Sequence, residues 1–399
     1  MRPRYLVPAL AALLYFSEGF PFGILNETVN TYLSLTKVQL STIGLIGSIG
    51  IVYTFKFLWS PLVDLFGSYR QWIFVALIVM AIALAALGHM EPASAPFWAA
   101  LIVLVFASAT HDIAADAMLI RITPEEQLGF VNSTRVAAYR GAMLVAGGGL
   151  AVLSDQIGWR NTFTVAACVP LAVFAVLFFT APAERSDSVK RENPFAALLT
   201  WLARPGALAL LAVVLLYRLG DNSMMAMIRP YWASRGFSAT EIGNVTTTIG
   251  MICTILGAIA GGAFVSRFGI YRSLLVLGLV QMLSNLAYAF VAMTSAGRGG
   301  LYSAAIVETF CGGLGTAAFL SFLMFICDRD NAATEYAMLS ALFALGRTIA
   351  VAISGFGAER LGFGPYYWLT AALALPGLAL LPLIRARLSA SATNAAPAP

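Results

Sequence analysis

Eleven ionisable side chains lie inside stretches of the sequence that are otherwise apolar. They are the five bases Lys56, Arg135, Arg140, Arg218 and Arg347 and the six acids Glu18, Glu27, Asp112, Asp116, Asp221 and Glu308. An isolated charge in an apolar environment is costly, so such groups pair with one another, face water or serve a function. The chemistry open to them is proton binding by the acids and recognition of anionic groups by the bases.

The spacing of two acids predicts a cluster. Asp112 and Asp116 are four residues apart, so on a helix they share one face. Arg135 and Arg140 lie at a similar estimated depth in the next apolar stretch, and Lys56 can join them. One interpretation is a static group of salt bridges. We favour a mixed role, in which the two aspartates position the bases and Arg140 or Lys56 meets an anionic group of a substrate.

Glu18 is followed by Gly19 and Pro21, which interrupt a helix. In an apolar environment such an interruption is tolerated only where it is buried in protein or lines a cavity. Glu18 should also lie near the middle of the apolar stretch, where loss of hydration favours the neutral acid, so we expect it to bind a proton. The residues predicted for proton coupling are Glu18, Asp112, Asp116 and Asp221.

The second half of the chain carries fewer buried charges. Arg218 and Asp221 are three residues apart and can pair within one helix. Arg347 has no acid nearby in its own stretch, so a substrate anion could be its partner. The residues predicted to bind substrate are Lys56, Arg140, Arg218, Asn222 and Arg347.

The composition indicates where these residues lie. Of 399 residues, 60% are hydrophobic and only 11% are charged, whereas soluble domains carry about 25% charged residues. The chain is therefore expected to be an all-α membrane protein. The four cysteines show no CxxC spacing, the two histidines are far apart, and no GxxxxGK[ST] motif occurs. We expect no metal, disulfide, nucleotide or other cofactor, and no nucleic-acid partner.

Twelve stretches are long enough to cross a bilayer, which takes about 20 apolar residues. They are Tyr5–Leu33, Ser41–Leu65, Gln71–Leu87, Pro96–Leu119, Phe130–Leu153, Trp159–Thr180, Gly206–Trp232, Thr240–Val265, Tyr271–Met293, Tyr302–Cys327, Tyr336–Gly357 and Tyr367–Ile384. This predicts an N-terminal six-helix half (1–180), a cytoplasmic linker (181–205), a C-terminal six-helix half (206–388) and a disordered tail (389–399).

The distribution of Lys and Arg predicts the orientation. With both termini inside, 13 of these residues lie on the inner side and six on the outer side, as expected because positive loops resist translocation. We expect a multi-pass, monomeric protein of the inner (cytoplasmic) membrane with both termini in the cytoplasm. The net charge of +5 then reflects topology.

An internal repeat relates the two halves. Residues 60–70 align with 262–272 at an offset of 202, with Val, Phe, Gly, Tyr and Arg identical. An even number of spans per half gives the two halves the same orientation, which is typical of transporters built from parallel repeats around a central substrate path.

Both copies of the repeat resemble the G-x-x-x-D-R-x-G-R-R loop of the major facilitator superfamily. The first copy keeps Asp64 and Gly67 and has Arg70 one position after the motif's last Arg, and the second copy has Ser266 in place of the Asp. The resemblance implies a gating role for Asp64, Gly67, Arg70, Arg267, Gly269 and Arg272. In one transport state, the acid and the bases would tie the inner helix ends together.

A narrower resemblance covers nearly the whole chain. Residues 53–64, 111–116, 138–140, 217–221 and 311–319 are similar to the AmpG muropeptide permeases. These permeases are related to acetyl-coenzyme A transporters and are similar to some single-subunit siderophore importers. The resemblance implies a transporter with no enzymatic activity.

We therefore expect proton-coupled import of a medium-sized anionic or amphiphilic, muropeptide-like solute by alternating access. A siderophore or an acyl-coenzyme A is the alternative cargo. A membrane-embedded transferase or a non-transporting receptor is the alternative class.

Overall fold

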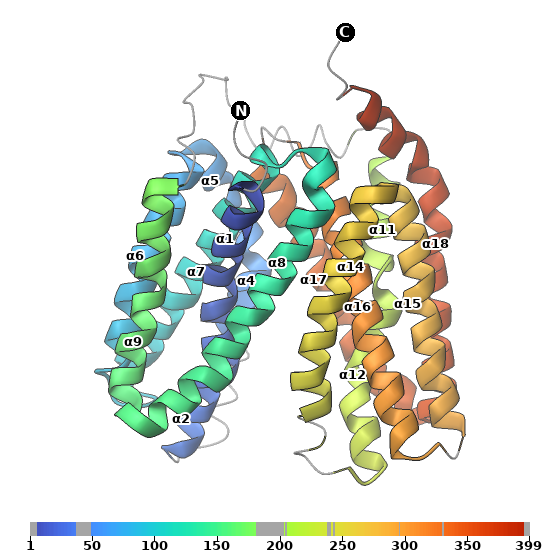
Figure 1. Ribbon diagram of the computed structural model, residues 1–399, viewed down its shortest axis with the longest axis horizontal. Helices are drawn as coiled ribbons and strands as arrows, with labels where there is room; N and C mark the ends of the chain where they lie inside the picture. The colour runs from blue at the N-terminus through green and yellow to red at the C-terminus, as the bar shows by residue number, and fades with distance from the viewer. Residues whose placement is uncertain are drawn as a thin grey trace. The chain divides into compact units, whose positions relative to one another are not determined.

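The computed structural model describes residues 6–36, 49–180, 203, 206–237, 241, 244–294, 296–328 and 331–394. All regular elements in these ranges are helices (Figure 1). Up to residue 180 they are α1 (Leu6–Gly23), η1 (Ile24–Thr28), α2 (Val29–Leu35), α4 (Ile51–Phe55), η2 (Lys56–Leu58), α5 (Ser60–Leu65), α6 (Tyr69–Leu87), α7 (Ala95–Ile122), η3 (Glu125–Gln127), α8 (Leu128–Leu144), η4 (Val145–Gly149) and α9 (Leu150–Thr180).

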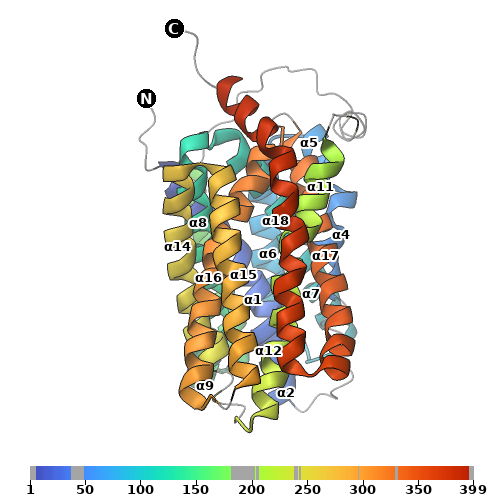
Figure 2. The ribbon, with the colours of Figure 1, turned by 90° about the vertical axis from the view of Figure 1, so that its right-hand side faces the viewer.

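The later elements are longer and less often interrupted. They are α11 (Ala207–Leu216), α12 (Leu219–Ser234), η5 (Asn244–Ile249), α14 (Gly250–Phe268), α15 (Ile270–Met293), α16 (Arg298–Ile326), α17 (Ala332–Leu361) and α18 (Phe363–Asn394). Within this group α15 lies between α16 and α18, and α14 packs along α16 (Figure 2).

The described residues contain ten helices that are long and apolar enough to cross a membrane. One of them, the continuous run over residues 125–180, contains two of the predicted spans, which are divided where Gly158 adopts φ 77°. The predicted span Ser41–Leu65 is described from residue 49 onward as α4, η2 and α5. The predicted twelve-span, all-α architecture is thereby accounted for.

The first span departs from regular α-helix just after Pro21. A proline ring prevents one intrahelical hydrogen bond, and the chain continues as the π-helical turn η1. A second π-helical turn, η4, lies against it, and Thr28 Oγ1 in η1 donates to the carbonyl of Ala146 in η4 at 2.5 Å. Isolated π turns within helices are frequent at functional sites.

The repeated loop adopts the same conformation in both copies. Gly67 and Gly269, which the offset of 202 relates, have φ values of 69° and 77°, a region that favours glycine. In the first copy, Ser68 then caps α6: its Oγ accepts from Gln71 N at 3.2 Å, while Gln71 Oε1 accepts from Ser68 N at 2.9 Å.

The chain divides into two compact units, and two short segments cross the expected boundary. One unit contains residues 1–123, 134–198 and 327–341; the other contains 124–133, 199–326 and 342–399. The first residues of α8 and the first residues of α17 thus belong to a different unit from the rest of the same helix. The predicted linker lies outside the described residues except for Ala203, and α18 extends to Asn394, into the segment expected to be a tail.

Small residues let neighbouring helices approach closely. A Cβ on Gly19 of α1 would lie 2.5 Å from the carbonyl oxygen of Tyr139 in α8, and one on Gly261 of α14 would lie 2.6 Å from that of Leu314 in α16. Such contacts bring transmembrane backbones together. Gly257, one turn earlier on α14, makes the same kind of contact, since its Cβ would collide with the carbonyl oxygen of Phe310 in α16.

We predict that Gly261→Ala lowers stability by roughly 1–3 kcal/mol, because the added methyl overfills a helix contact. Gly355→Ala is the matched control, since Gly355 is also helical and its Cβ would meet nothing within 4 Å. Thermal unfolding of both variants in detergent measures the difference. Equal midpoints for the two would show that the α14–α16 contact is not tight.

Candidate functional site

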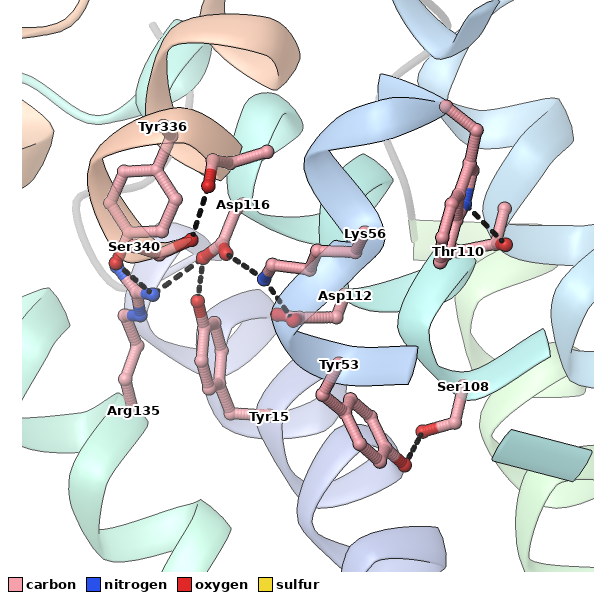
Figure 3. A network of polar contacts seen from close by, with 12 residues as sticks. Tyr15, Tyr53, Lys56, Ser108, Thr110, Asp112, Asp116, Arg135, Tyr336 and Ser340 are labelled. Carbon is pink, nitrogen blue, oxygen red and sulfur yellow. Dashed lines mark hydrogen bonds and ion pairs between the residues drawn. The ribbon is translucent and has the colours of Figure 1, made fainter. Parts of the chain in front are cut away.

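A buried polar network in the N-terminal unit centres on Asp116 of α7 (Figure 3). Lys56, at the start of η2, forms an ion pair with Asp112, and its Nζ lies 3.9 Å from Asp116 Oδ2. Both aspartates face the same side of α7, as their four-residue spacing predicts. Exposed fractions of 6%, 7% and 3% for Lys56, Asp112 and Asp116 place this group in the protein interior.

Arg135 of α8 completes the network from the other side. Its Nη2 lies 2.5 Å from Asp116 Oδ1 and donates to Tyr336 OH at 3.1 Å. Tyr15 of α1 donates to the same carboxylate oxygen, and the Arg135 guanidinium lies 4.0 Å from the centre of the Tyr15 ring. Asp116 is therefore held by three elements, α1, α8 and η2, and through Arg135 it is linked to α17.

Glu18 and His111 border this network. Glu18 lies next to Asp112, and its Oε2 is buried with no hydrogen-bond partner among the described residues. His111 is fully buried, and its Nε2 lies 3.1 Å from Ser17 Oγ. Because Ser17 Oγ donates to the carbonyl of Leu14 at 2.8 Å, it is left to accept from His111 Nε2–H.

The charges of this network do not balance. Among the contacts described above, Glu18, Asp112 and Asp116 supply three acids, while Lys56 and Arg135 supply two bases. Burying a carboxylate without a compensating cation is costly. The cluster therefore favours a state in which one of its three carboxyl groups carries a proton.

The C-terminal unit contains a smaller charged group. Arg218 Nε lies 3.5 Å from Asp221 Oδ2, the pairing that their three-residue spacing predicts. Arg218 Nη1 also donates to Thr316 Oγ1 at 2.8 Å, and Asn285 Nδ2 donates to Asp221 Oδ1 at 3.4 Å.

The other residues predicted to bind substrate are more accessible. Arg140 and Asn222 are partly exposed. Arg347 of α17 is exposed and has neither an ion pair nor a hydrogen bond with the residues that the structure describes. Of the five, Lys56 and Arg218 are thus held by acids of the protein, whereas Arg347 has its guanidinium available.

Asp64 of the predicted gating motif binds the first turn of α17. Its carboxylate accepts from Thr334 N at 2.8 Å, Thr334 Oγ1 at 2.5 Å and Ala333 N at 3.3 Å. Tyr69 OH donates to the same group at 2.6 Å. A carboxylate at a helix N-terminus satisfies free amide groups and complements the helix dipole. Asp64 is therefore a capping residue supplied from outside the helix it caps.

The basic residues of the motif differ between the two copies. Arg70 Nη2 donates to the carbonyl of Phe178 at 2.7 Å, and its guanidinium lies 5.0 Å from the centre of the Phe74 ring. Arg267 and Arg272 of the second copy are exposed. The contact made by the motif's acid, Asp64 with the start of α17, thus belongs to the first copy. This agrees with the second copy, in which Ser266 replaces the acid.

Sequence reasoning missed the uncharged members of the site. Tyr15, Tyr336 and Thr334 contact the charged groups, but their side chains are neutral and give no signal in a search for buried charges. One signal was present, since Tyr15 and Tyr217 are related by the offset of 202.

The sequence model of the family described as Major Facilitator Superfamily matches residues 9–334. The chain belongs to the major facilitator superfamily. The resemblance to AmpG permeases is also confirmed: the chain is 33% identical over 398 residues to the anhydromuropeptide permease of Escherichia coli K12, covering 97% of this chain and 81% of the relative.

Further relatives of this superfamily member are consistent with that assignment. The chain is 27% identical to putative transporter AmpG 4 of Rickettsia conorii, over 92% of this chain and 94% of the relative. Its fold matches the E. coli fucose:proton symporter FucP with a TM-score of 0.74 at 18% identity, covering 94% and 98% of the two chains. The human organic anion transporter MFSD10 matches with a TM-score of 0.73 at 14% identity, covering 96% and 100%.

We predict that Asp112→Leu alone destabilises this facilitator by about 3–5 kcal/mol, because it removes the ion-pair partner of a buried lysine. Lys56→Met combined with Asp112→Leu is expected to recover most of that loss. The exposed pair Arg298–Glu241, 2.7 Å apart, is the control, and Glu241→Ala is expected to cost about 0–1 kcal/mol. Thermal unfolding measures these three variants and Lys56→Met alone. A double variant as unstable as the sum of its single variants would contradict the pairing.

We also predict that Asp64→Ala speeds hydrogen–deuterium exchange in the first turn of α17. Loss of the acceptor for Ala333 N and Thr334 N removes about 1 kcal/mol or more per hydrogen bond, so exchange there is expected to rise about tenfold. Asp155→Ala, at an exposed position, is the control. Unchanged exchange over residues 331–336 would mean that Asp64 does not cap α17.

Proposed function

We propose that this facilitator imports an anhydromuropeptide-like solute into the cytoplasm, coupled to protons. The observation that carries the proposal is the buried network around Asp116, in which three acids meet two bases. The whole-chain similarity to a protein named as an anhydromuropeptide permease supports the class of cargo.

Coupling follows from the ion pair between Lys56 and Asp112. A proton that binds Asp112 neutralises it, and the buried ammonium of Lys56 then lacks its closest counter-charge. A carboxylate of the cargo can replace Asp112 at Lys56. When the cargo leaves, the proton is released and the ion pair forms again. Proton and anionic cargo thereby favour the same state, which is the thermodynamic requirement for symport.

The accessible bases suit the other end of such a cargo. A muropeptide-like solute carries peptide carboxylates, and the planar guanidinium of Arg binds a carboxylate through two hydrogen bonds. Arg347 has no partner among the described residues, and Arg140 is partly exposed. We assign Arg140 and Arg347 to the first encounter with cargo and Lys56 to the coupled step.

The proposal includes the location and orientation. The excess of Lys and Arg on one side supports an orientation with both termini in the cytoplasm, and we propose a monomer of the inner membrane. Glu18 and Asp116 share the proton with Asp112, because the carboxyl group of Glu18 adjoins that of Asp112 and both aspartates approach Lys56.

Uptake by proteoliposomes tests this function. We expect labelled anhydromuropeptide to accumulate several-fold more with an imposed inward proton gradient than without it. Arg140→Ala and Arg347→Ala are expected to lower uptake at least tenfold, mainly by raising KM, while the control Arg298→Ala transports normally. Equal uptake with and without the gradient would exclude proton coupling.

The same assay decides the cargo. An excess of a siderophore or an acyl-coenzyme A is expected to leave muropeptide uptake unchanged. Inhibition by one of them, together with its own uptake, would assign that cargo instead. If every solute binds but none crosses the bilayer, the chain is a receptor and the transport proposal is wrong.

A further inference from the structure

The C-terminal unit holds buried polar groups that the proposed transport step does not use. Gln281 and Asn285 of α15 and Glu308 of α16 are 3%, 0% and 2% exposed. Four of their polar atoms, Gln281 Oε1 and Nε2, Asn285 Oδ1 and Glu308 Oε2, are buried and have no hydrogen-bond partner within the part of the chain that the structure describes. Leaving such atoms unsatisfied costs about 1–3 kcal/mol each, so they indicate a small polar ligand.

Open space lies beside Gln281. Asp221, Gln281 and Gly315 help to line a cavity of about 10 Å³, roughly what one water molecule needs. A Cβ on Gly312 would lie 3.9 Å from both Gln281 Oε1 and Glu308 Oε1. The two oxygens therefore border one space, which stays open because residue 312 has no side chain.

The charges around Glu308 are also unbalanced. Within the described residues Glu308 forms no ion pair, because the neighbouring cation, Arg218, is engaged by Asp221 and Thr316. The titratable and charged groups near enough to interact electrostatically with Glu308 are Arg218, Asp221, Tyr288 of α15, Tyr367 of α18 and Cys311 of its own helix. One cation thus faces two acids, and burial strongly favours a neutral second carboxyl group.

We propose that the C-terminal unit contains a hydrated proton-binding site, in which Glu308 carries the proton and a bound water joins it to Gln281 and Asp221. The water donates to the free oxygen of Gln281 and accepts from its Nε2–H or from the carboxylic acid of Glu308. When the proton leaves through the water, Glu308 becomes a carboxylate. Arg218 is then shared between two acids, which weakens its ion pair with Asp221.

This site goes beyond the proposed function, which places the coupling acids in the other unit. The proton on Glu308 is a property of the resting protein and requires neither cargo nor a gradient. Its test can therefore succeed or fail independently of proton-coupled uptake.

Infrared difference spectroscopy of the purified protein at neutral pH, without cargo, tests the proton. We expect the wild-type spectrum to contain a carboxylic-acid C=O band that shifts in D2O and is lost in Glu308→Gln. Glu241→Gln, which alters a partly exposed acid in an ion pair with Arg298, is the matched control and is expected to retain the band. Identical wild-type and Glu308→Gln spectra in this region would overturn the proposal.

Gly312→Ala tests the water and keeps Glu308 in place. The methyl group fits in ordinary contact with both oxygens but occupies the space of the water. The C=O band is expected to remain and to move to higher frequency, because it loses a hydrogen bond. A band at unchanged frequency would overturn the hydrated site, even if Glu308→Gln fails to fold.

Discussion

The ion pairing of Asp116 is the interaction on which the N-terminal unit depends. The Asp116 carboxylate forms an ion pair with Arg135 and accepts a hydrogen bond from Tyr15. The ammonium group of Lys56 in η2 lies 3.9 Å from it. In a membrane span these groups cannot be satisfied by bulk water, so each must find its partner within the protein. The positions of α1, η2, α7 and α8 relative to one another are consequently constrained by one carboxyl group as well as by apolar contact.

The two units use the same sequence repeat for different purposes. In the first copy Asp64 caps α17, whereas the second copy has Ser266 at the corresponding place. The glycine turns are nevertheless alike, since Gly67 and Gly269 share a positive φ. Duplication has thus kept the backbone conformation and changed the electrostatic contact, which gives two related halves unequal roles in binding charge.

Much of the fold could be predicted from the sequence because apolar length and internal repetition are strong signals. The shared face of Asp112 and Asp116 and the pairing of Arg218 with Asp221 were also predictable, since helical spacing sets which charges lie on one side of a helix. Gln281 and Asn285 were not found, because neutral amides carry no charge signal. The capping of α17 by Asp64 was not found either, because it joins residues 270 positions apart.

The π-helical turn η1 has a consequence for alignment between relatives. An α-helix advances about 100° per residue, and a π turn accommodates one extra residue without extending the hydrogen-bonded ladder. A homologue with one residue fewer between Pro21 and Val29 would retain the span but present the residues beyond it on a different face. The placement of a single gap in the first helix thus decides whether a polar residue such as Glu27 has a true structural counterpart.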